Sequence, residues 1–265
     1  MIFIFPLIDR NPYHVDVMVT AGIFMLLALG LNVIVGFAGI LNLGYAALYA
    51  VGAYTYAFVN LHFKIPFWPG LLISALAASI FGMLLACPAL RLGGDYLAIV
   101  TLGAGEIVRI MLNNLDAVTG GPNGLLGIAH PSVWVPGRLH YDFSVKSAPY
   151  YFLVFGFVVI TVFFLRRLES SRLGRSWVAL REDELAASCM GINTAWAKLS
   201  AFGIGGFTAG LAGCIFAAKQ GTVSPDSFDF VISVMVLAMV VLGGLGNIAG
   251  AILGALVLLN LSKFQ

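Results

Sequence analysis

The sequence is divided into apolar stretches that are each close to the length of a membrane-spanning helix. They lie at 17–36, 41–59, 67–87, 95–112, 149–165, 199–218 and 230–245, with a shorter one at 249–261. A helix needs about 20 residues to cross the hydrocarbon of a bilayer. Within lipid, only helices and closed barrels satisfy every backbone hydrogen bond. The sequence therefore predicts an all-α, multi-pass helical bundle with about seven to eight transmembrane helices.

The composition is that of a membrane protein. Hydrophobic residues make up 60% of the chain and charged residues only 10%, whereas soluble domains contain about 25% charged residues. No linker or low-complexity block divides residues 1–265, so we expect a single transmembrane domain. Its surroundings are then the lipid bilayer, and no nucleic-acid partner is expected.

The sequence lacks the motifs of an enzyme or of a cofactor site. It has no G-x-x-x-x-G-K-[ST] phosphate loop, no H-E-x-x-H and no G-x-S-x-G. A G-x-G-x-x-A match at 244–249 follows a membrane span and lacks the acidic residue of a dinucleotide site. The cysteines and histidines have no ligand spacing. We therefore expect no catalytic residue, no metal and no cofactor.

The segment 166–198 is the longest polar interruption between apolar stretches. It carries ten of the chain's 26 charged residues, six of them Lys or Arg. Cytoplasmic loops carry the excess of positive charge, so 166–198 is predicted to be a cytoplasmic loop that meets a soluble partner. One span earlier, the loop 113–148 has only Arg138 and Lys146 as basic residues and is predicted to be periplasmic.

Two short helices are predicted within 166–198. Ser176 is suited to cap a helix at 177–181, and Asp183 a second one at 184–190. Gly191 then provides the left-handed residue that ends the second helix.

The exposed face of that second helix is expected to be small enough for the groove of a partner protein to approach it. It would consist of Ala186, Ala187 and Ser188. A helix lying on lipid headgroups is the alternative interpretation, which suits the basic residues of 166–175. It suits the acidic residues of 182–184 badly, because anionic lipid repels them.

Polar side chains within the apolar spans mark a candidate solute pathway, because such groups are costly in lipid. The glycines at 36, 39, 44 and 52 permit local unwinding beside it. The candidates are Asn32, Asn42, Tyr45 and Glu106. The alternative is structural, with the amides and the hydroxyl bonding neighbouring helices and Glu106 pairing with Arg109.

The outer loop 113–148 is too long to be a mere connector. It begins with a turn-forming cluster, and we expect either a docking or gating surface or an interfacial helix. The candidate gate residues are Thr119, Gly120, Gly121, Pro122 and Asn123. Glycines at helix-contact spacing, as at 206 and 210, indicate close helix packing within the subunit or at a subunit interface.

Several blocks of the sequence resemble permeases of the branched-chain amino-acid ABC importers, in particular the M-type subunit. The blocks are GLNVIVGFAGILNLGYAALYAVGAYT, GGDYLAIVTLGAGEIVRIMLNN, TGGPNGL and GRSWVALREDELAASCMGIN. The last contains ELAASCMG, which is similar to the family's coupling motif of two alanines followed after three residues by glycine. Leu185 stands where the family has glutamate.

The resemblance implies an ATP-driven importer of leucine, isoleucine and valine in the inner membrane. Its partners would be a homologous H-type permease, two cytoplasmic ABC ATPases and a periplasmic substrate-binding protein. Asn32, Asn42 and Tyr45 would then line the gap between the two permeases. The ATPase-coupling residues would be Arg181, Glu182, Asp183, Glu184, Leu185, Ala186, Ala187 and Gly191.

The resemblance also implies a further span at each end, so this chain is expected to be truncated at one or both ends. Two alternatives remain open for the function. One is an ABC permease for urea, short amides or another small polar solute. The other is a secondary transporter, although the only carboxylate available for coupling within the confident spans is Glu106.

Overall fold

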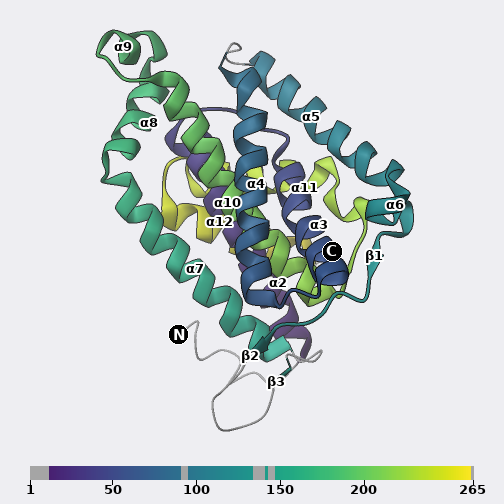
Figure 1. Ribbon diagram of the computed structural model, residues 1–265. Coiled ribbons are helices and arrows are strands. Elements are labelled where there is room, and N and C mark those ends of the chain that lie inside the picture. The colour runs from purple at the N-terminus through teal and green to yellow at the C-terminus, as the bar shows by residue number, and fades with distance from the viewer. Residues whose placement is uncertain (1–11, 91–94, 134–140, 143–146, 264–265) are drawn as a thin grey trace.

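The computed structural model describes residues 12–90, 95–133, 141–142 and 147–263, which form a bundle of long helices (Figure 1). The long helices are α2 (Pro12–Leu31), α3 (Tyr45–Phe63), α4 (Phe67–Ala89), α5 (Asp95–Asn114), α7 (Ser147–Glu169), α10 (Thr194–Gln220), α11 (Phe230–Gly243) and α12 (Ile248–Lys263). The shorter ones are α6 (Asp116–Thr119), α8 (Arg172–Glu182), α9 (Glu184–Cys189), the π-helix η2 (Asn32–Phe37) and the 3-10 helices η3 (Gly121–Asn123) and η4 (Pro225–Phe228). The all-α class is confirmed.

Six helices in the described part of the chain are long and apolar enough to cross a membrane. The helix α3, predicted as a span at 41–59, is not among these six. It is 19 residues long but contains four tyrosines, which lower its hydropathy. Most of α3 is buried against other helices, so it does not need a lipid-like surface. With the shorter apolar segment of α12, these helices match the predicted number approximately.

The centre of the bundle is formed by α10 and by α2 with its continuation η2. In each, 83% of the most apolar window is buried, compared with 11% in α5 and 33% in α7. The more exposed helices carry large apolar side chains on their outer faces, such as Ile99 and Phe163. These faces have the chemistry of a lipid-facing surface.

Glycines allow α10 to pack closely on α4 and α3. A Cβ on Gly206 would lie 2.5 Å from the carbonyl oxygen of Ala78, and a Cβ on Gly210 would lie 2.7 Å from that of Ser74. On α3, Gly52 meets Gly210 in the same way. Small residues let helices approach where apolar surface alone gives no reason to associate. The pair at 206 and 210 therefore serves packing within the subunit.

We call the end of the bundle that carries α8 and α9 the inner end, following the predicted sidedness, and the opposite end the outer end. At the outer end, the strands β1 (Leu125–Leu126) and β4 (Thr222–Val223) pair antiparallel. The strands β2 (Ser132–Val133) and β3 (Tyr141–Asp142) form a second pair. The predicted loop 113–148 thus contains short ordered elements, and 134–140 and 143–146 lie outside the described residues.

Candidate functional site

The charged segment 166–198 folds into the two short helices α8 and α9, which project at the inner end (Figure 1). The prediction for the first of them is wrong, because α8 begins at Arg172 and its cap is Ser171. The Ser171 hydroxyl accepts a hydrogen bond from the Gly174 amide at 3.3 Å. Ser176 lies within the helix, where its hydroxyl donates to the Leu173 carbonyl. The earlier start buries Trp177 and Leu180 on one face of α8.

The prediction for α9 is confirmed at its start and for the role of Gly191, although the helix ends at Cys189, one residue earlier than predicted. The Asp183 carboxylate caps it by accepting a hydrogen bond of 3.0 Å from the Ala186 amide. Gly191 follows the helix with a φ of +81°, a conformation that glycine adopts without steric cost. An exposed helix of six residues results.

The exposed surface of α9 differs from the expected one at one position. Ala187 is buried, with 4% of its surface exposed, and it faces inward rather than toward a partner. Ala186 and Ser188 are exposed as expected. The most prominent apolar side chains are Leu185, 78% exposed, and Met190, 82% exposed. Met190 was not among the predicted residues, although its position one helical turn after Ala186 could have indicated it.

Two side-chain contacts attach α8 and α9, which we call the docking helices after their predicted role, to the start of α10. The Trp177 indole donates to the Ala197 carbonyl at 2.9 Å and to the Ser200 hydroxyl at 3.1 Å. The Lys198 amine forms an ion pair of 2.6 Å with the Glu184 carboxylate. Glu184 therefore has a partner within the chain, and this ion pair holds α9 against the start of α10.

Arg181 points toward the bundle, although its residue as a whole is exposed. Its Nη1 donates a hydrogen bond of 2.7 Å to the carbonyl oxygen of Gly36, in η2. Glu182 and Asp183 are exposed beside it. Among the predicted coupling residues, Glu184 thus contacts α10 and Arg181 contacts η2, the continuation of α2.

The predicted pathway residues of the first two spans are buried and bonded within the chain. The Asn32 Oδ1 accepts from the Gly246 amide at 2.9 Å, and the Asn42 Oδ1 accepts from the Gly44 amide at 2.9 Å. The Tyr45 hydroxyl donates to the Gly205 carbonyl at 2.9 Å. None of the three side chains reaches the surface of the chain in this conformation.

The chain unwinds between these residues. Residues 38–44 are not helical, so the second span begins at Tyr45 instead of 41. Gly39 lies in this segment with a φ of +70°, a conformation that glycine adopts without steric cost, and the backbone of Gly44 packs against that of Thr101 on α5. Gly52, which was also considered as a site of unwinding, lies in the regular helix α3. The amide nitrogens of Asn32 and Asn42 are buried without a hydrogen-bond partner among the described residues.

Glu106 lies on α5 and pairs with Arg109, which was the structural alternative for this residue. The Arg109 Nε lies 3.1 Å from the Glu106 carboxylate, and both side chains are about one-third exposed. Glu106 also lines a small cleft with Gly44, Ala47 and Ser233. This cleft is bordered by the start of α3, by α5 and by the first turn of α11.

The predicted gate residues form an ordered turn at the outer end. The Thr119 hydroxyl is buried and donates to the carbonyls of Leu112 and Leu115. Gly120 and Gly121 have positive φ angles, which this turn requires. Pro122 and Asn123 are exposed, so they are the part of the cluster that a partner can reach.

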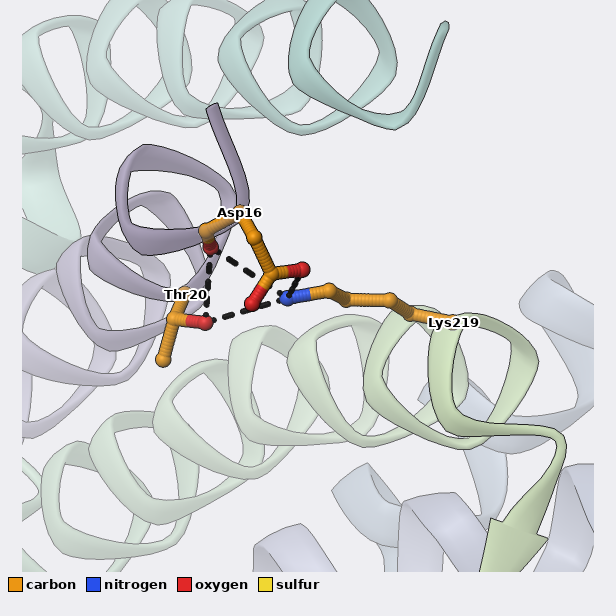
Figure 2. Close-up of polar contacts among 3 residues, drawn as sticks. All are labelled: Asp16, Thr20 and Lys219. Atoms are coloured by element: carbon orange, nitrogen blue, oxygen red, sulfur yellow. Dashed lines mark hydrogen bonds and ion pairs between the residues drawn. The ribbon is translucent and has the colours of Figure 1, made fainter. Parts of the chain in front are cut away.

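Sequence reasoning missed one polar contact at the outer end, between α2 and α10. Figure 2 shows Lys219 reaching from the last turn of α10 to Asp16 and Thr20 of α2. Its Nζ lies 2.8 Å from the Asp16 carboxylate and 3.0 Å from the Thr20 hydroxyl. The sequence could have indicated this contact, because Asp16 and Lys219 carry opposite charges at the predicted outer ends of two spans.

The fold and these sites define a multi-pass helical membrane domain with docking helices exposed at one end. Residues 13–264 match the family model described as "Branched-chain amino acid transport system / permease component". The chain therefore belongs to this family of membrane permeases. No solved structure matches the chain.

Curated relatives agree with the family. The chain is 46% identical over 261 residues to the high-affinity branched-chain amino acid transport system permease protein LivM of Escherichia coli, covering 92% of this chain and 61% of that protein. It is 27% identical over 251 residues to LivH of the same organism, covering 89% of this chain and 79% of that protein. It is 27% identical over 290 residues to the probable LivM of Methanocaldococcus jannaschii, covering 92% and 80%.

Proposed function

We propose that the chain is a permease subunit of an ATP-driven importer of branched-chain amino acids, located in the inner (plasma) membrane. The observation that carries this proposal is the 46% identity to a LivM permease over 92% of the chain. The solutes, leucine, isoleucine and valine, have an apolar side chain and a zwitterionic head without net charge. A polar route without a fixed intramembrane ion suits them, and Asn32, Asn42 and Tyr45 are uncharged.

The proposed partners are an H-type permease, two ABC ATPases and a periplasmic substrate-binding protein. Two features support them. The docking helices expose Leu185 and Met190 at the inner end, where these side chains are available to a soluble partner. The sequence has no phosphate loop of its own, so ATP would be hydrolysed by separate subunits.

We also propose that Asn32, Asn42, Tyr45 and Glu106 border the solute pathway, with the charge of Glu106 balanced by its ion pair with Arg109. Asn32 and Asn42 carry this proposal, because the amide nitrogen of each is buried without a partner in the described structure and such groups call for an explanation. Asn42→Leu is expected to lower leucine uptake about tenfold, the loss typical of one polar contact worth roughly 1.4 kcal/mol. Thr101→Val is the control, because it removes a neighbouring hydroxyl that accepts from the Leu43 amide and donates to the Ala98 carbonyl. Unaltered uptake by Asn42→Leu would assign Asn42 to packing.

Reconstitution in vesicles tests the proposed function. The chain, an H-type permease and the ATPases are incorporated with the binding protein outside, and uptake of labelled leucine is followed with and without ATP. We expect uptake only when the ATPases and ATP are both present. Vesicles without ATPases, but with a sodium or proton gradient, are the control.

Two results would contradict the proposal in different ways. Leucine uptake driven by an ion gradient without ATPases would indicate a secondary transporter. ATP-dependent uptake of labelled urea, unaffected by an excess of leucine, would instead keep the ABC mechanism and change the solute.

A further inference from the structure

Arg181 connects the docking helices to the bundle at a point where the central helix ends. It lies in the last turn of α8, two residues before the cap of α9. Its hydrogen bond to Gly36 joins residues 145 positions apart in the sequence. The aliphatic part of its side chain passes over Gly39, where a Cβ would lie only 2.8 Å from the Arg181 Cγ. The path of this arginine toward η2 therefore depends on a glycine.

The carbonyl of Gly36 is among the last ones of its helix, which have no amide partner within that helix. The continuous helix of α2 and η2 ends at Phe37, and the last carbonyls of a helix carry partial negative charge. The amides of Ala38 and Ile40 pair with two earlier carbonyls, those of Val33 and Ile34. Arg181 supplies a cationic donor to the carbonyl of Gly36, which makes a charge-assisted and therefore stronger hydrogen bond.

Three distant segments meet at this point, which we call the inner junction and define as Asn32, Gly36, Arg181 and Gly246. The Gly246 amide, in the turn between α11 and α12, donates to the Asn32 side chain. A Cβ on Gly36 would lie 2.5 Å from the nitrogen of Gly246, so the two backbones are in close contact. The G-x-G-x-x-A match at 244–249 is this turn, with positive φ angles at Gly244 and Gly246.

The inner junction has features of an element that rearranges. Its helical part is a π-helix, a form that occurs frequently at functional sites. The Asn32 amide nitrogen is buried without a partner in the described part of the chain, so one hydrogen-bond donor of the inner junction is unsatisfied in this conformation. At its other end, α2 is tied to α10 through Asp16 and Lys219. A displacement of Gly36 would therefore also displace α2, which runs through the centre of the bundle.

We propose that Arg181 is a positioning residue that transmits movement of the docking helices to η2 and so to the central helix α2. The inference rests on the proposed function, since it takes α8 and α9 as the part that the ATPases move. It assigns Arg181 to contact with the bundle, whereas Leu185, Ala186 and Met190 remain for contact with the ATPase.

The test follows the inner end of the central helix directly. In the assembled complex, with Cys87, Cys189 and Cys214 replaced by serine or alanine, Leu41→Cys is labelled with a water-soluble thiol reagent with and without ATP. Leu41 lies four residues after η2 and is 39% exposed. ATP hydrolysis, association with the ATPases and leucine uptake are measured on the same samples.

The variants isolate the hydrogen bond. Arg181→Met keeps the aliphatic stem over Gly39 but removes the donor, and Arg181→Lys keeps a cationic donor. Arg175→Met is the matched control on α8, because the Arg175 guanidinium also donates to a backbone carbonyl at 2.8 Å, but to the nearby Ser170. If Arg181→Met does not assemble, Arg181→Gln, which keeps only a neutral donor, takes its place.

With Arg181 we expect ATP to change the labelling rate of Leu41→Cys. In Arg181→Met this response and the uptake per ATP hydrolysed should fall about tenfold, the effect of roughly 1.4 kcal/mol from one lost charged hydrogen bond. Hydrolysis and association should stay within about twofold, and Arg181→Lys should restore part of the response. Arg175→Met should behave as the unmodified chain.

Several outcomes would overturn the inference. They are an absent ATP response with Arg181 present, an unchanged response in Arg181→Met, an equal loss in Arg175→Met, or hydrolysis that falls in proportion to uptake. An ATP response that depends on Arg181 in a complex that takes up no leucine would leave the inference standing and reject the proposed solute.

Discussion

Asp16 and Lys219 illustrate how an ion pair works at the end of a membrane helix. The Lys219 side chain is 12% exposed, so its amine needs polar partners in place of water. The Asp16 side chain is 47% exposed, so solvent screens the attraction between the two charges. We therefore expect a modest coupling energy, above that of a fully exposed pair.

A double-mutant cycle with Asp16→Asn and Lys219→Met should give a coupling energy of about 1 kcal/mol in the free energy of unfolding. The measurement is denaturant unfolding in detergent micelles at low and high salt. The pair Glu106 and Arg109, on one helix and more exposed, is the control and should give about 0.3 kcal/mol. A larger coupling energy in the control pair would contradict the argument that burial of Lys219 strengthens its ion pair with Asp16.

At the scale of elements, α9 is a short helix that depends on its attachments. A single helix of this length is unstable in water. It is held by the Asp183 cap, by the ion pair between Glu184 and Lys198, and by burial of Ala187. Its exposed side is therefore presented in one orientation, as a docking surface requires.

Ala186→Trp is expected to abolish co-purification of the ATPases while leaving membrane insertion intact, because Ala186 is exposed on α9 and a bulky side chain would block a groove. The measurement is pull-down from detergent-solubilised membranes. Ser170→Trp, also exposed but at the start of the segment before α8, is the control. Ala187→Trp is a poorer probe, because it would disturb packing as well as docking. Normal association of Ala186→Trp would mean that α9 serves another purpose.

At the scale of the whole molecule, contacts between distant segments follow the predicted sides of the membrane. Segments predicted inside touch one another, as Arg181 and Gly36 do. Segments predicted outside do the same, as β1 and β4 or Asp16 and Lys219 do. This agreement comes from tertiary contacts that the count of spans did not use.

Thiol labelling tests the absolute orientation. With Cys87 replaced by serine, a membrane-impermeant maleimide should label the exposed Cys189 in inverted vesicles and not in intact cells, since Cys214 is buried. In a cysteine-free background, Leu126→Cys, 65% exposed at the outer end, should show the opposite behaviour. Labelling of Cys189 from outside would reverse the topology.

The sequence by itself determined the class, the approximate helix boundaries and the presence of two short helices in the charged segment 166–198. These follow from local properties: apolar length, charge distribution and the capping chemistry of Asp183 and Gly191. The start of α8 was misjudged because Ser171 and Ser176 are both suitable caps. In the structure Ser171 caps the helix, and the Ser176 hydroxyl bonds to the Leu173 carbonyl within it.

Only the tertiary structure decided which polar groups meet. Arg181, Gly36 and Gly246 have no local pattern that connects them, and their contact arises because the ends of α2, α8 and α11 converge at the inner end. The burial of Ala187 likewise depends on how α9 lies on its neighbours. Such contacts join residues far apart in the sequence, and one-dimensional periodicity carries no information about the distance between them.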